Sequence, residues 1–123
     1  MTLKELAEEL IAANRENRTD GLLEAHYHPD AVSVEATPMP GTDTAECVGL
    51  EGIKGKHAWW DANMEFVEGA IEGPYLHGED RFAVIFNSTF KEKASGTLMP
   101  MAEVAVYHVA DGKIVREEFF YTM

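Results

Sequence analysis

The sequence predicts an α+β domain in which N-terminal helices precede a curved antiparallel β-sheet. Three observations lead to this fold class. Apolar residues in the first half of the chain recur at steps of three and four, which is typical of amphipathic helices. The second half contains four long segments separated by short Gly-containing turns, which is typical of hairpin-linked strands. The length of 123 residues fits one domain, spanning residues 1–123.

Two helices are predicted before the first strand. The first runs from about Thr2 to Asn17, and its buried face consists of Leu3, Leu6, Ala7, Leu10 and Ile11. Thr19 or Asp20 can cap a second, shorter helix that carries Leu22, Leu23 and Tyr27. Pro29 ends this helix because the residue before a proline avoids the helical region.

A short strand and a third helix follow. The strand covers Ala31–Ala36, with Val32 and Val34 on one side and Ala31, Ser33 and Glu35 on the other. After a loop rich in Pro, Gly and Thr, a third helix begins near Gly52. Its stripe consists of Ile53, His57, Trp60 and Met64, which fall at steps of four, three and four.

The four long strands complete the predicted sheet. They cover Phe66–His77, Arg81–Phe90, Met99–Val109 and Ile114–Met123. Strands of this length in a small domain usually belong to a sheet that curls.

The charge balance excludes several classes of partner. The chain has 10 basic and 22 acidic residues and a net charge of -12, which repels nucleic acids and anionic membranes. No apolar run approaches the roughly 20 residues of a membrane helix, and the N-terminus lacks the pattern of a secretion signal. The single Cys47 cannot form an internal disulfide. We therefore expect a cytoplasmic protein.

Several short motifs and the order of the elements carry a resemblance to a known superfamily. The motifs are Tyr27–Val32 at the entry to the first strand, Gly52-Ile53 followed by aromatic residues, and Asp111–Val115 followed by Phe119–Tyr121. The chain resembles the SnoaL-like (polyketide cyclase-like) domains of the nuclear-transport-factor-2-like superfamily along essentially its whole length. This resemblance implies a cone-shaped curved antiparallel β-sheet wrapped by three N-terminal helices, a cystatin-like α+β barrel. Members include cyclases, ketosteroid isomerases, epoxide hydrolases, dehydratases and non-catalytic domains, so the resemblance identifies the fold better than the activity.

The last hairpin determines which side chains share a face of the sheet. A three-residue turn at Ala110-Asp111-Gly112 requires positive φ only at the glycine and pairs Val109 with Lys113. The residues that then share one face are Met101, Glu103, Ala105, Glu117, Phe119 and Tyr121. In this register Ala105 lies opposite Glu117 and Glu103 opposite Phe119. A two-residue turn would instead pair Glu103 with Phe120.

The resemblance to ketosteroid isomerases suggests which face is concave. It implies that Glu117, Phe119 and Tyr121 point inward, together with Glu103. It also places Glu35 at the position of the proton-abstracting carboxylate and His57 at that of an aromatic hydrogen-bonding residue. The isomerases' oxyanion-holding tyrosine and protonated aspartate have no counterparts here, which argues against a standard ketosteroid isomerase.

The first functional hypothesis is an enzyme that moves a proton next to a carbonyl group without a cofactor. Glu35 is the predicted base, and Glu103 or Glu117, expected to form a diagonal pair, is the acid or second base. His57 and Tyr121 are predicted to bind the carbonyl oxygen. The other predicted ligand-binding residues are Trp60, Met101, Phe119 and Tyr27. The acidic residues favour a neutral or cationic small hydrophobic molecule over an anion.

Structural roles for the same residues remain open at this point. The glutamates can instead bind Arg81, Arg116 or Lys113 on a solvated face, and the aromatic side chains can fill the core. The alternative hypothesis is therefore a non-catalytic ligand-binding or dimerisation module. We expect no metal, because His26 and His28 with Glu35 match no familiar ligand spacing.

The outward face of the predicted sheet indicates self-association. Val104, Val106 and Phe120 form an apolar stripe that a monomer would expose to water. Because related domains often pair through this convex face, we expect a twofold homodimer.

Overall fold

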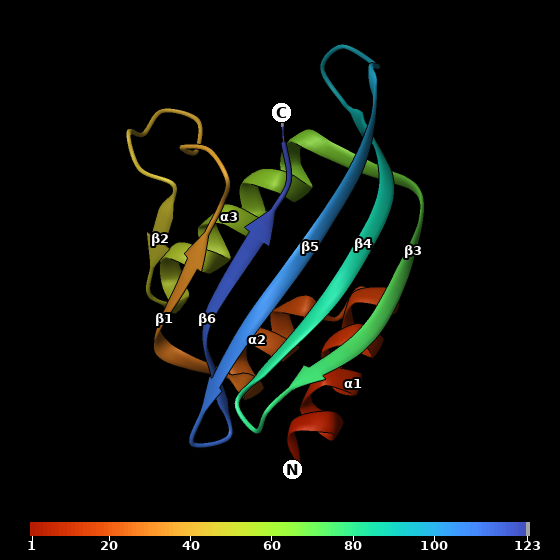
Figure 1. The fold of residues 1–123 in the computed structure, drawn as a ribbon. Coiled ribbons are helices and arrows are strands. Elements are labelled where there is room, and N and C mark those ends of the chain that lie inside the picture. Colours follow the sequence, from red (N-terminus) through yellow and green to blue (C-terminus); the bar gives the residue numbers. More distant parts are fainter. Residues whose placement is uncertain (123) are drawn as a thin grey trace.

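A computed structural model describes residues 1–122 and contains three helices and one six-stranded sheet (Figure 1). The helices are α1 (Leu3–Arg15), α2 (Thr19–His26) and α3 (Leu50–Asn63), and the strands are β1 (Tyr27–Val34), β2 (Glu46–Val48), β3 (Met64–His77), β4 (Arg81–Glu92), β5 (Leu98–Ala110) and β6 (Lys113–Phe120). The predicted fold class is confirmed.

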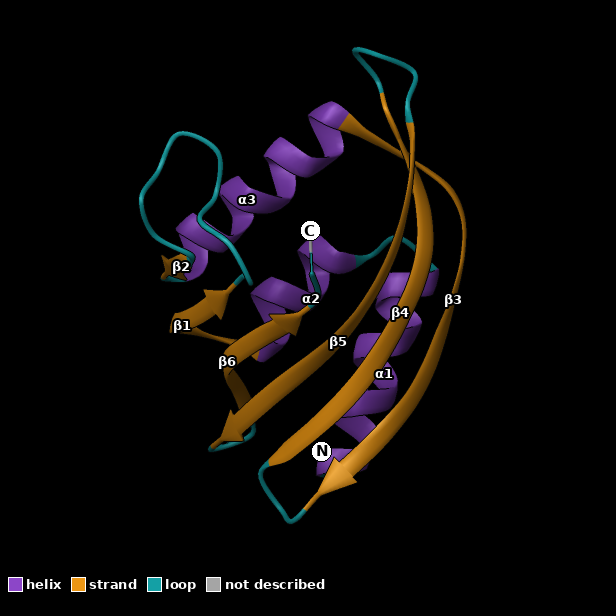
Figure 2. Ribbon diagram, turned by 45° about the horizontal axis from the view of Figure 1, so that its top comes forward, coloured by secondary structure: helices purple, strands orange, loops and turns teal. Residues whose placement is uncertain are grey.

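The sheet is curved and unclosed, with the strand order β2-β1-β6-β5-β4-β3. Neighbouring strands are antiparallel except β1 and β6, which are parallel. The long strands β3, β4 and β5 bend around the helices, and the three helices occupy the concave side (Figure 2). Two register shifts in β3, at Val67 and at Gly73-Pro74, interrupt its pairing with β4. Bulges of this kind increase local twist and contribute to the curvature.

A local sequence signal explains where α1 begins, whereas α2 and α3 begin without a side-chain cap. Thr2 caps α1, and its side chain and that of Glu5 form a reciprocal capping box. Helix α2 begins at the expected position, but its cap residue is Arg18, which makes no side-chain capping hydrogen bond, so the predicted capping by Thr19 or Asp20 is wrong. Helix α3 begins at Leu50, two residues earlier than predicted.

The strands differ from the prediction mainly at their ends. Helix α2 ends at His26, so Tyr27, which was predicted to lie in the helix, is instead the first residue of β1. Pro29 lies inside β1. The three-residue strand β2 was not predicted, and it pairs with β1 through Val32–Val48 and Val34–Glu46. Strand β6 ends at Phe120, and the last residue of the predicted strand, Met123, lies outside the described residues.

The β5–β6 turn contains two residues instead of the predicted three. Ala110 pairs with Lys113, so only Asp111 and Gly112 form the turn, with φ values of 51° and 75°. A type I′ turn needs positive φ at both central residues, and Asp-Gly is one of its preferred sequences. The three-residue turn was predicted because it avoids positive φ at Asp111, but aspartate tolerates the left-handed region better than most residues.

A bulge in β6 then returns the side chains that follow it to the face of the sheet on which the predicted three-residue turn would have placed them. The pairing changes from Val109–Ile114 to His108–Arg116, so β6 has one extra residue at this point. The turn and the bulge together move β6 by two residues relative to the predicted register, and a two-residue shift keeps every side chain on its face.

The individual pairs predicted for this hairpin are therefore wrong, although the shared face is right. Phe119, not Glu117, lies opposite Ala105, and Tyr107 lies opposite Glu117. The predicted Glu103–Phe119 pair does not form. Glu103 still shares the inner face with Ala105 and Tyr107 because side chains alternate along β5.

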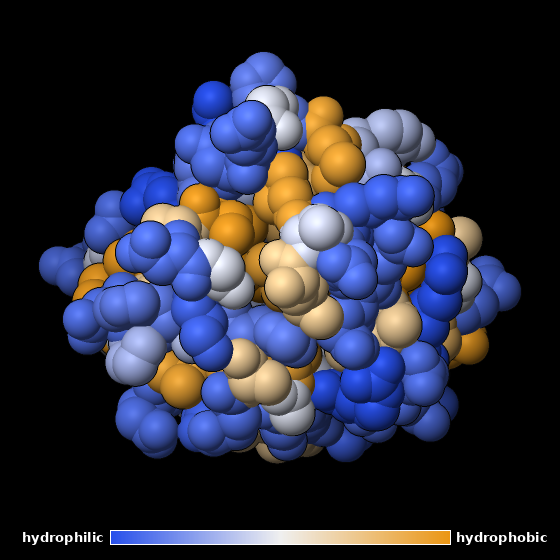
Figure 3. Space-filling model, turned by 90° about the horizontal axis from the view of Figure 1, so that it is seen from below, coloured by the Kyte–Doolittle hydropathy of each residue, from blue (hydrophilic) through white to orange (hydrophobic). Residues whose placement is uncertain are grey.

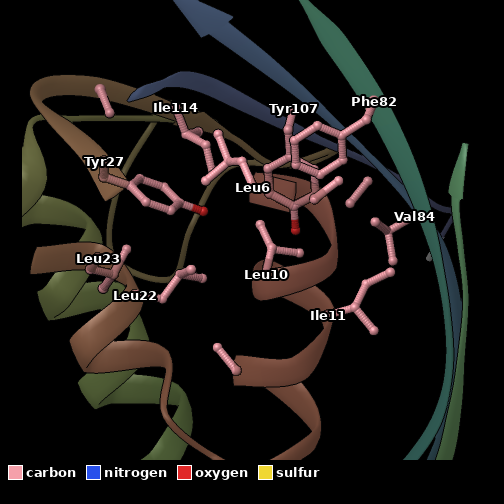
Figure 4. Packing of buried hydrophobic residues seen from close by; sticks show 14 of the residues in the cluster. Leu6, Leu10, Ile11, Leu22, Leu23, Tyr27, Phe82, Val84, Tyr107 and Ile114 are labelled. Atoms are coloured by element: carbon pink, nitrogen blue, oxygen red, sulfur yellow. The ribbon is translucent and has the colours of Figure 1, made fainter. Parts of the chain in front are cut away.

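The hydrophobic core lies between the lower half of the sheet and helices α1 and α2. The labelled side chains in Figure 4 come from both helices and from β1, β4, β5 and β6. The rings of Phe82 and Tyr107 stack with centroids 4.9 Å apart. The lower end of the molecule is mainly hydrophilic, with small apolar patches (Figure 3). No helix in residues 1–122 is long and apolar enough to cross a membrane.

Two glycine substitutions are expected to change stability in opposite directions. Gly112→Val should lower the free energy of unfolding by about 1–2 kcal/mol, because a β-branched residue is strained at positive φ. Gly55→Ala should raise it by about 0.5–1 kcal/mol, because Gly55 lies inside α3. Nothing lies within 4 Å of a Cβ added at either position, so backbone conformation alone determines both effects. Urea denaturation monitored by circular dichroism measures them, and equal effects of the two substitutions would contradict the turn geometry.

Candidate active site

Strand pairing arranges the inner face of the sheet into rows of side chains. The inner row, next to the core, consists of Ser33, Glu117, Tyr107 and Phe82, which lie opposite one another on β1, β6, β5 and β4. The middle row contains Phe119, Ala105 and Val84. The outer row contains Glu103 opposite Phe86. Helix α3 packs against β1 and β2 beside these rows (Figures 1 and 2).

Glu117 is the buried acid of the inner row. Only 2% of the residue is exposed. The hydroxyl of Tyr27, at the start of β1, donates a hydrogen bond to Glu117 Oε2 at 2.5 Å. Burial raises the pKa of Tyr27 well above its usual range, and the charge of Glu117 adds to this effect. Tyr27 was predicted to contact a ligand, but its hydroxyl is engaged by Glu117.

Glu35 lies at the centre of a second polar group, the Glu35 cluster, which consists of Glu35, Lys56, Ser33 and Tyr121. Lys56 Nζ donates to Glu35 Oε1 at 2.8 Å and to Ser33 Oγ at 2.5 Å. The Tyr121 hydroxyl donates to Glu35 Oε2 at 2.9 Å. The Lys56 and Glu35 side chains are 16% and 20% exposed. Both oxygens of the predicted base are thus held by neighbouring side chains.

Lys56 is the functional candidate that the sequence analysis missed. Its ammonium group lies 4.9 Å from the centroid of the Phe119 ring, which allows a cation–π contact. The helical stripe offered a signal, because Lys56 follows the buried Ile53 by three residues and such neighbours share a helix face. His57 was chosen from the same stripe and is half-buried.

Glu103 differs from the other two acids because no hydrogen bond engages it within the described residues. It lies half-buried on β5. Burial raises its pKa from 4.5 to about 7, and the negative charge of Glu35 adds to the rise, while Lys56 opposes it. Glu103 therefore exchanges protons near neutral pH, as a general acid or base requires.

The expected contacts of Glu103 and Glu117 differ from those in the structure. The two residues do not form a diagonal pair, because Tyr107 lies opposite Glu117 and four positions separate Glu103 from Tyr107. The basic residues considered as structural partners bind elsewhere. Arg116 lies 3.5 Å from Glu118 on the outer face, Lys113 donates to the Ala25 carbonyl, and Arg81 lies 3.5 Å from Asp80.

The remaining predicted ligand-binding residues lie near the outer row. Met101 lies opposite Ser88, two positions beyond Glu103 on β5. Trp60, at the end of α3, contacts Phe90 edge-on with ring centroids 5.0 Å apart. A solvent-open depression of about 570 Å³ lies at the ends of β1 and β6, and its lining includes Glu35, Phe119 and Tyr121.

The described residues contain no group of three or more His, Cys, Asp or Glu side chains placed to hold a metal ion. Cys47 is partly buried next to α3, and burial raises the pKa of its thiol. A raised pKa makes a thiol a poor nucleophile at neutral pH. The polar groups that the described residues bring together at the site are carboxyl, ammonium, hydroxyl and phenol groups.

Comparisons with known proteins agree with this architecture. The model of the SnoaL-like domain family matches residues 1–121. A solved structure from Mesorhizobium loti, provisionally described as a SnoaL-like polyketide cyclase, is 36% identical and has a TM-score of 0.88. The match covers 98% of this chain and 100% of that one.

More distant structures share the fold. A protein from Bacillus subtilis, provisionally described as an isomerase, is 17% identical with a TM-score of 0.74, covering 99% of this chain and 90% of that one. A Catenulispora acidiphila protein with a ketosteroid isomerase-like fold, in complex with trimethylamine, is 20% identical with a TM-score of 0.68. The match covers 85% of this chain and 75% of that one. A search of curated proteins finds no match.

The raised pKa of Glu103 predicts a pH-dependent change in stability. Its folded-state pKa of about 7 exceeds the ordinary value of 4.5, so the folded protein binds the proton more tightly than the unfolded chain. This stabilisation is complete below pH 4.5 and is lost as the pH rises through 7. Glu103→Gln has no carboxyl group to ionise and therefore avoids this loss. Its free energy of unfolding should exceed that of the wild type by roughly 1–3 kcal/mol at pH 8, where the lower value allows for solvent screening.

Urea denaturation at pH 4.5, 6 and 8 measures this difference between the wild type and Glu103→Gln. Glu65→Gln, at an exposed position on β3, is the matched control and should change stability equally at every pH. If the free energies of unfolding of Glu103→Gln and the wild type change with pH in parallel, the Glu103 carboxyl titrates normally and the prediction is contradicted.

Proposed function

Because the chain belongs to the SnoaL-like domain family, we propose that it is a cofactor-independent enzyme that moves a proton next to a carbonyl group. Isomerases, cyclases and dehydratases all use such a step. The proposed substrate is a small, neutral, hydrophobic molecule. The observation that carries the proposal is Glu103, a half-buried carboxyl group with a pKa of about 7 and no hydrogen bond to another described residue.

Glu103 is the proposed general base and acid. With a pKa near neutrality, it accepts a proton from a carbon next to the carbonyl group and returns it to another position. This assignment replaces Glu35 as the proposed base. Glu35 accepts one hydrogen bond at each of its two oxygens, from Lys56 and from Tyr121, whereas no described residue forms a hydrogen bond with Glu103.

Lys56 is the proposed stabiliser of negative charge on the substrate oxygen. Removal of a proton next to a carbonyl leaves an enolate, and an ammonium group in a partly dry site stabilises such an oxygen strongly. Glu35 and Ser33 hold Lys56 in place through their hydrogen bonds. Tyr121 and the half-buried His57 remain proposed hydrogen-bonding groups for the same oxygen.

The charge of the site supports a neutral or cationic substrate over an anionic one. Three carboxyl groups, those of Glu35, Glu103 and Glu117, surround one ammonium group, that of Lys56, and their charges influence one another. An additional anion would be repelled by the excess negative charge. The trimethylamine bound by the Catenulispora acidiphila protein is a small amine, which agrees with this preference.

The proposal also agrees with the provisional names of the relatives. The Mesorhizobium loti protein is described as a polyketide cyclase and the Bacillus subtilis protein as an isomerase. Both reactions commonly begin by removing a proton next to a carbonyl group. The identity of 36% to the first protein supports a related chemistry more strongly than the fold similarity to the second.

Deuterium exchange into a simple ketone tests this function, and the natural substrate need not be identified for it. 1-Tetralone, a neutral bicyclic ketone, is incubated with the protein in D₂O, and exchange next to its carbonyl group is followed by NMR. We expect catalysed exchange whose rate rises with pH through about 7, because the base must be ionised. Glu103→Gln should slow it by about a hundredfold or more.

Two further variants make this test specific. Lys56→Met should slow exchange through loss of charge stabilisation, whereas Glu68→Gln, at an exposed position on β3, should leave the rate unchanged. Unchanged exchange in Glu103→Gln would contradict the assigned base.

A non-catalytic binding module is the second candidate function. It is favoured by the Glu35 cluster, in which the polar groups of Glu35 and Lys56 already bind one another and Tyr121. A binding module requires no free acid or base. It predicts that the melting temperature rises with the logarithm of the 1-tetralone concentration above Kd, while exchange in D₂O stays at the uncatalysed rate.

We also propose that the protein forms a cytoplasmic homodimer through the outer face of the sheet. Val104 and Phe120 lie opposite each other on β5 and β6 and are 38% and 55% exposed. Apolar side chains in such adjacent positions favour association. The free thiol of Cys47 agrees with a reducing compartment.

Light scattering after gel filtration tests the dimer. The wild type at micromolar concentration should elute as a dimer, and Val104→Glu should produce a monomer because it places a charge in the proposed interface. Leu76→Glu, at an exposed position on β3, should leave the dimer intact. A monomeric wild type would refute the proposed dimer.

A further inference from the structure

The depression at the ends of β1 and β6 is bordered by both faces of the sheet. Glu35, Phe119 and Tyr121 reach it from the inner face. Its lining also includes residues that alternate with inner-face residues along the chain and therefore lie on the outer face, namely Val34, Ala102, Glu118 and Phe120. Strands β1 and β6 end side by side, so the two faces of the sheet meet around their ends (Figure 1). The Glu35 cluster therefore opens onto the outer face.

This depression is open to solvent and acidic. The carboxyl groups of Glu35 and Glu118 both line it. Water weakens the interactions between charged groups, whereas a site closed to water strengthens them. A group that covers the depression and carries positive charge would therefore both exclude water and balance the two carboxylates.

Basic side chains form a row on the same outer face, farther along the strands. Arg116, His108, Arg81 and His77 lie opposite one another on β6, β5, β4 and β3. We call these four residues the basic row. In a chain with a net charge of -12, such a row is a local exception. Arg116 lies 3.5 Å from Glu118 of its own chain, and the five N–H groups of an arginine allow it to bind a second carboxylate as well.

Apolar side chains separate the basic row from the depression. Along the outer face of β5, His108 is followed by Val106, Val104 and Ala102, at intervals of two residues or about 7 Å. Val106 lies opposite an alanine of β4, and Val104 lies between an isoleucine of β4 and the exposed Phe120. The basic row and the depression thus lie at opposite sides of one apolar strip, at similar distances from its middle.

This spacing matches a twofold axis that runs across the strands between Val104 and Val106. Such an axis places Val104 of one copy against Val106 of the other, and His108 against Ala102. The basic row of each copy then lies over the depression of the other, so opposite charges meet twice. An axis parallel to the strands would instead place the two basic rows against each other, which like-charge repulsion disfavours.

We propose that a second copy of this chain completes the candidate site, with Arg116 of the partner subunit covering the depression beside Glu35 and Glu118. In this arrangement Arg116 of the partner subunit lies two residues beyond the level of Phe120, where Thr122 lines the depression. The inference rests on the proposed function, including the dimer, and adds that the site is complete only in the dimer. Exchange activity should therefore depend on assembly.

Chemical cross-linking tests the arrangement of the two copies without reference to activity. Cys47→Ala removes the natural thiol, and Ala102→Cys and His108→Cys are introduced into separate chains in this background. The two chains are refolded together from urea and treated with a bismaleimide of roughly 10 Å span, the distance between packed sheets. The mixture should form covalent dimers, whereas each chain alone should form few. Equal cross-linking of the mixture and the single chains, or none, would overturn the proposed arrangement.

Subunit mixing tests whether Arg116 acts across the dimer. Arg116→Met should slow exchange into 1-tetralone about tenfold, and Arg116→Lys, which keeps the charge, should retain most of the rate. When Arg116→Met is refolded together with the inactive Glu103→Gln, each mixed dimer contains one site with both Glu103 and Arg116 of the partner subunit. Exchange should then return to roughly a quarter of the wild-type rate, because half of the dimers are mixed and each has one complete site.

The matched control mixes Lys56→Met with Glu103→Gln. Lys56 and Glu103 belong to the same site of one chain, so this mixture should not regain activity. An Arg116→Met variant with the wild-type rate, or a mixture with Glu103→Gln that regains nothing, would overturn the inference, because Arg116 would then have no role in the partner's site.

The two experiments separate this inference from the proposed reaction. Cross-linking in the expected pairs without catalysed exchange would contradict only the reaction. Catalysed exchange without these cross-links and without recovery on mixing would contradict only the inference. A wild type that remains monomeric at micromolar concentration would overturn both the dimer and the completed site, and catalysed exchange by that monomer would leave the reaction standing.

Discussion

The pairing of β5 with β6 is the constraint on which the candidate site depends. A tight turn at Asp111-Gly112 and a bulge next to Val109 together place Glu117 on the same face as Glu103. With the turn alone, β6 would be displaced by one residue and Glu117 would face solvent. The bulge therefore determines the polarity of the interior as much as any side chain does, and a deletion there would exchange the two faces of β6.

Within that interior, each acid has a different environment. Glu117 is sealed and held by Tyr27, Glu35 is paired with Lys56, and Glu103 is half-buried and unbound by described residues. Burial penalises charge, and a nearby like charge increases the penalty, whereas an ammonium group reduces it. Three chemically identical groups thereby differ in their hydrogen bonds and in the charges around them.

The sequence predicted the fold and most inward-facing residues, because both follow from periodic patterns and a family resemblance. It predicted the inner face of β6 although the individual pairs are displaced by two residues, because a two-residue displacement keeps each side chain on its face. Asp111-Gly112 is a preferred sequence for a two-residue turn, whereas the bulge has no strong signal in one sequence. Lys56 was missed because a lysine in a helix is usually solvated, and its burial depends on the distant Glu35 and Ser33. A residue whose role depends on partners far away in the sequence cannot be recognised from the spacing of its sequence neighbours.

The sheet and α3 contribute opposite charges to the site. The acids lie on the sheet or at its edge, whereas the ammonium group that acts on Glu103 comes from Lys56 on α3. Selection can consequently alter the helix without disturbing the strand pairing that the fold requires. Loss of Lys56 alone would turn a mixed site into a purely anionic one suited to cations. A substitution at this single position of α3 can therefore change which ligands the fold binds.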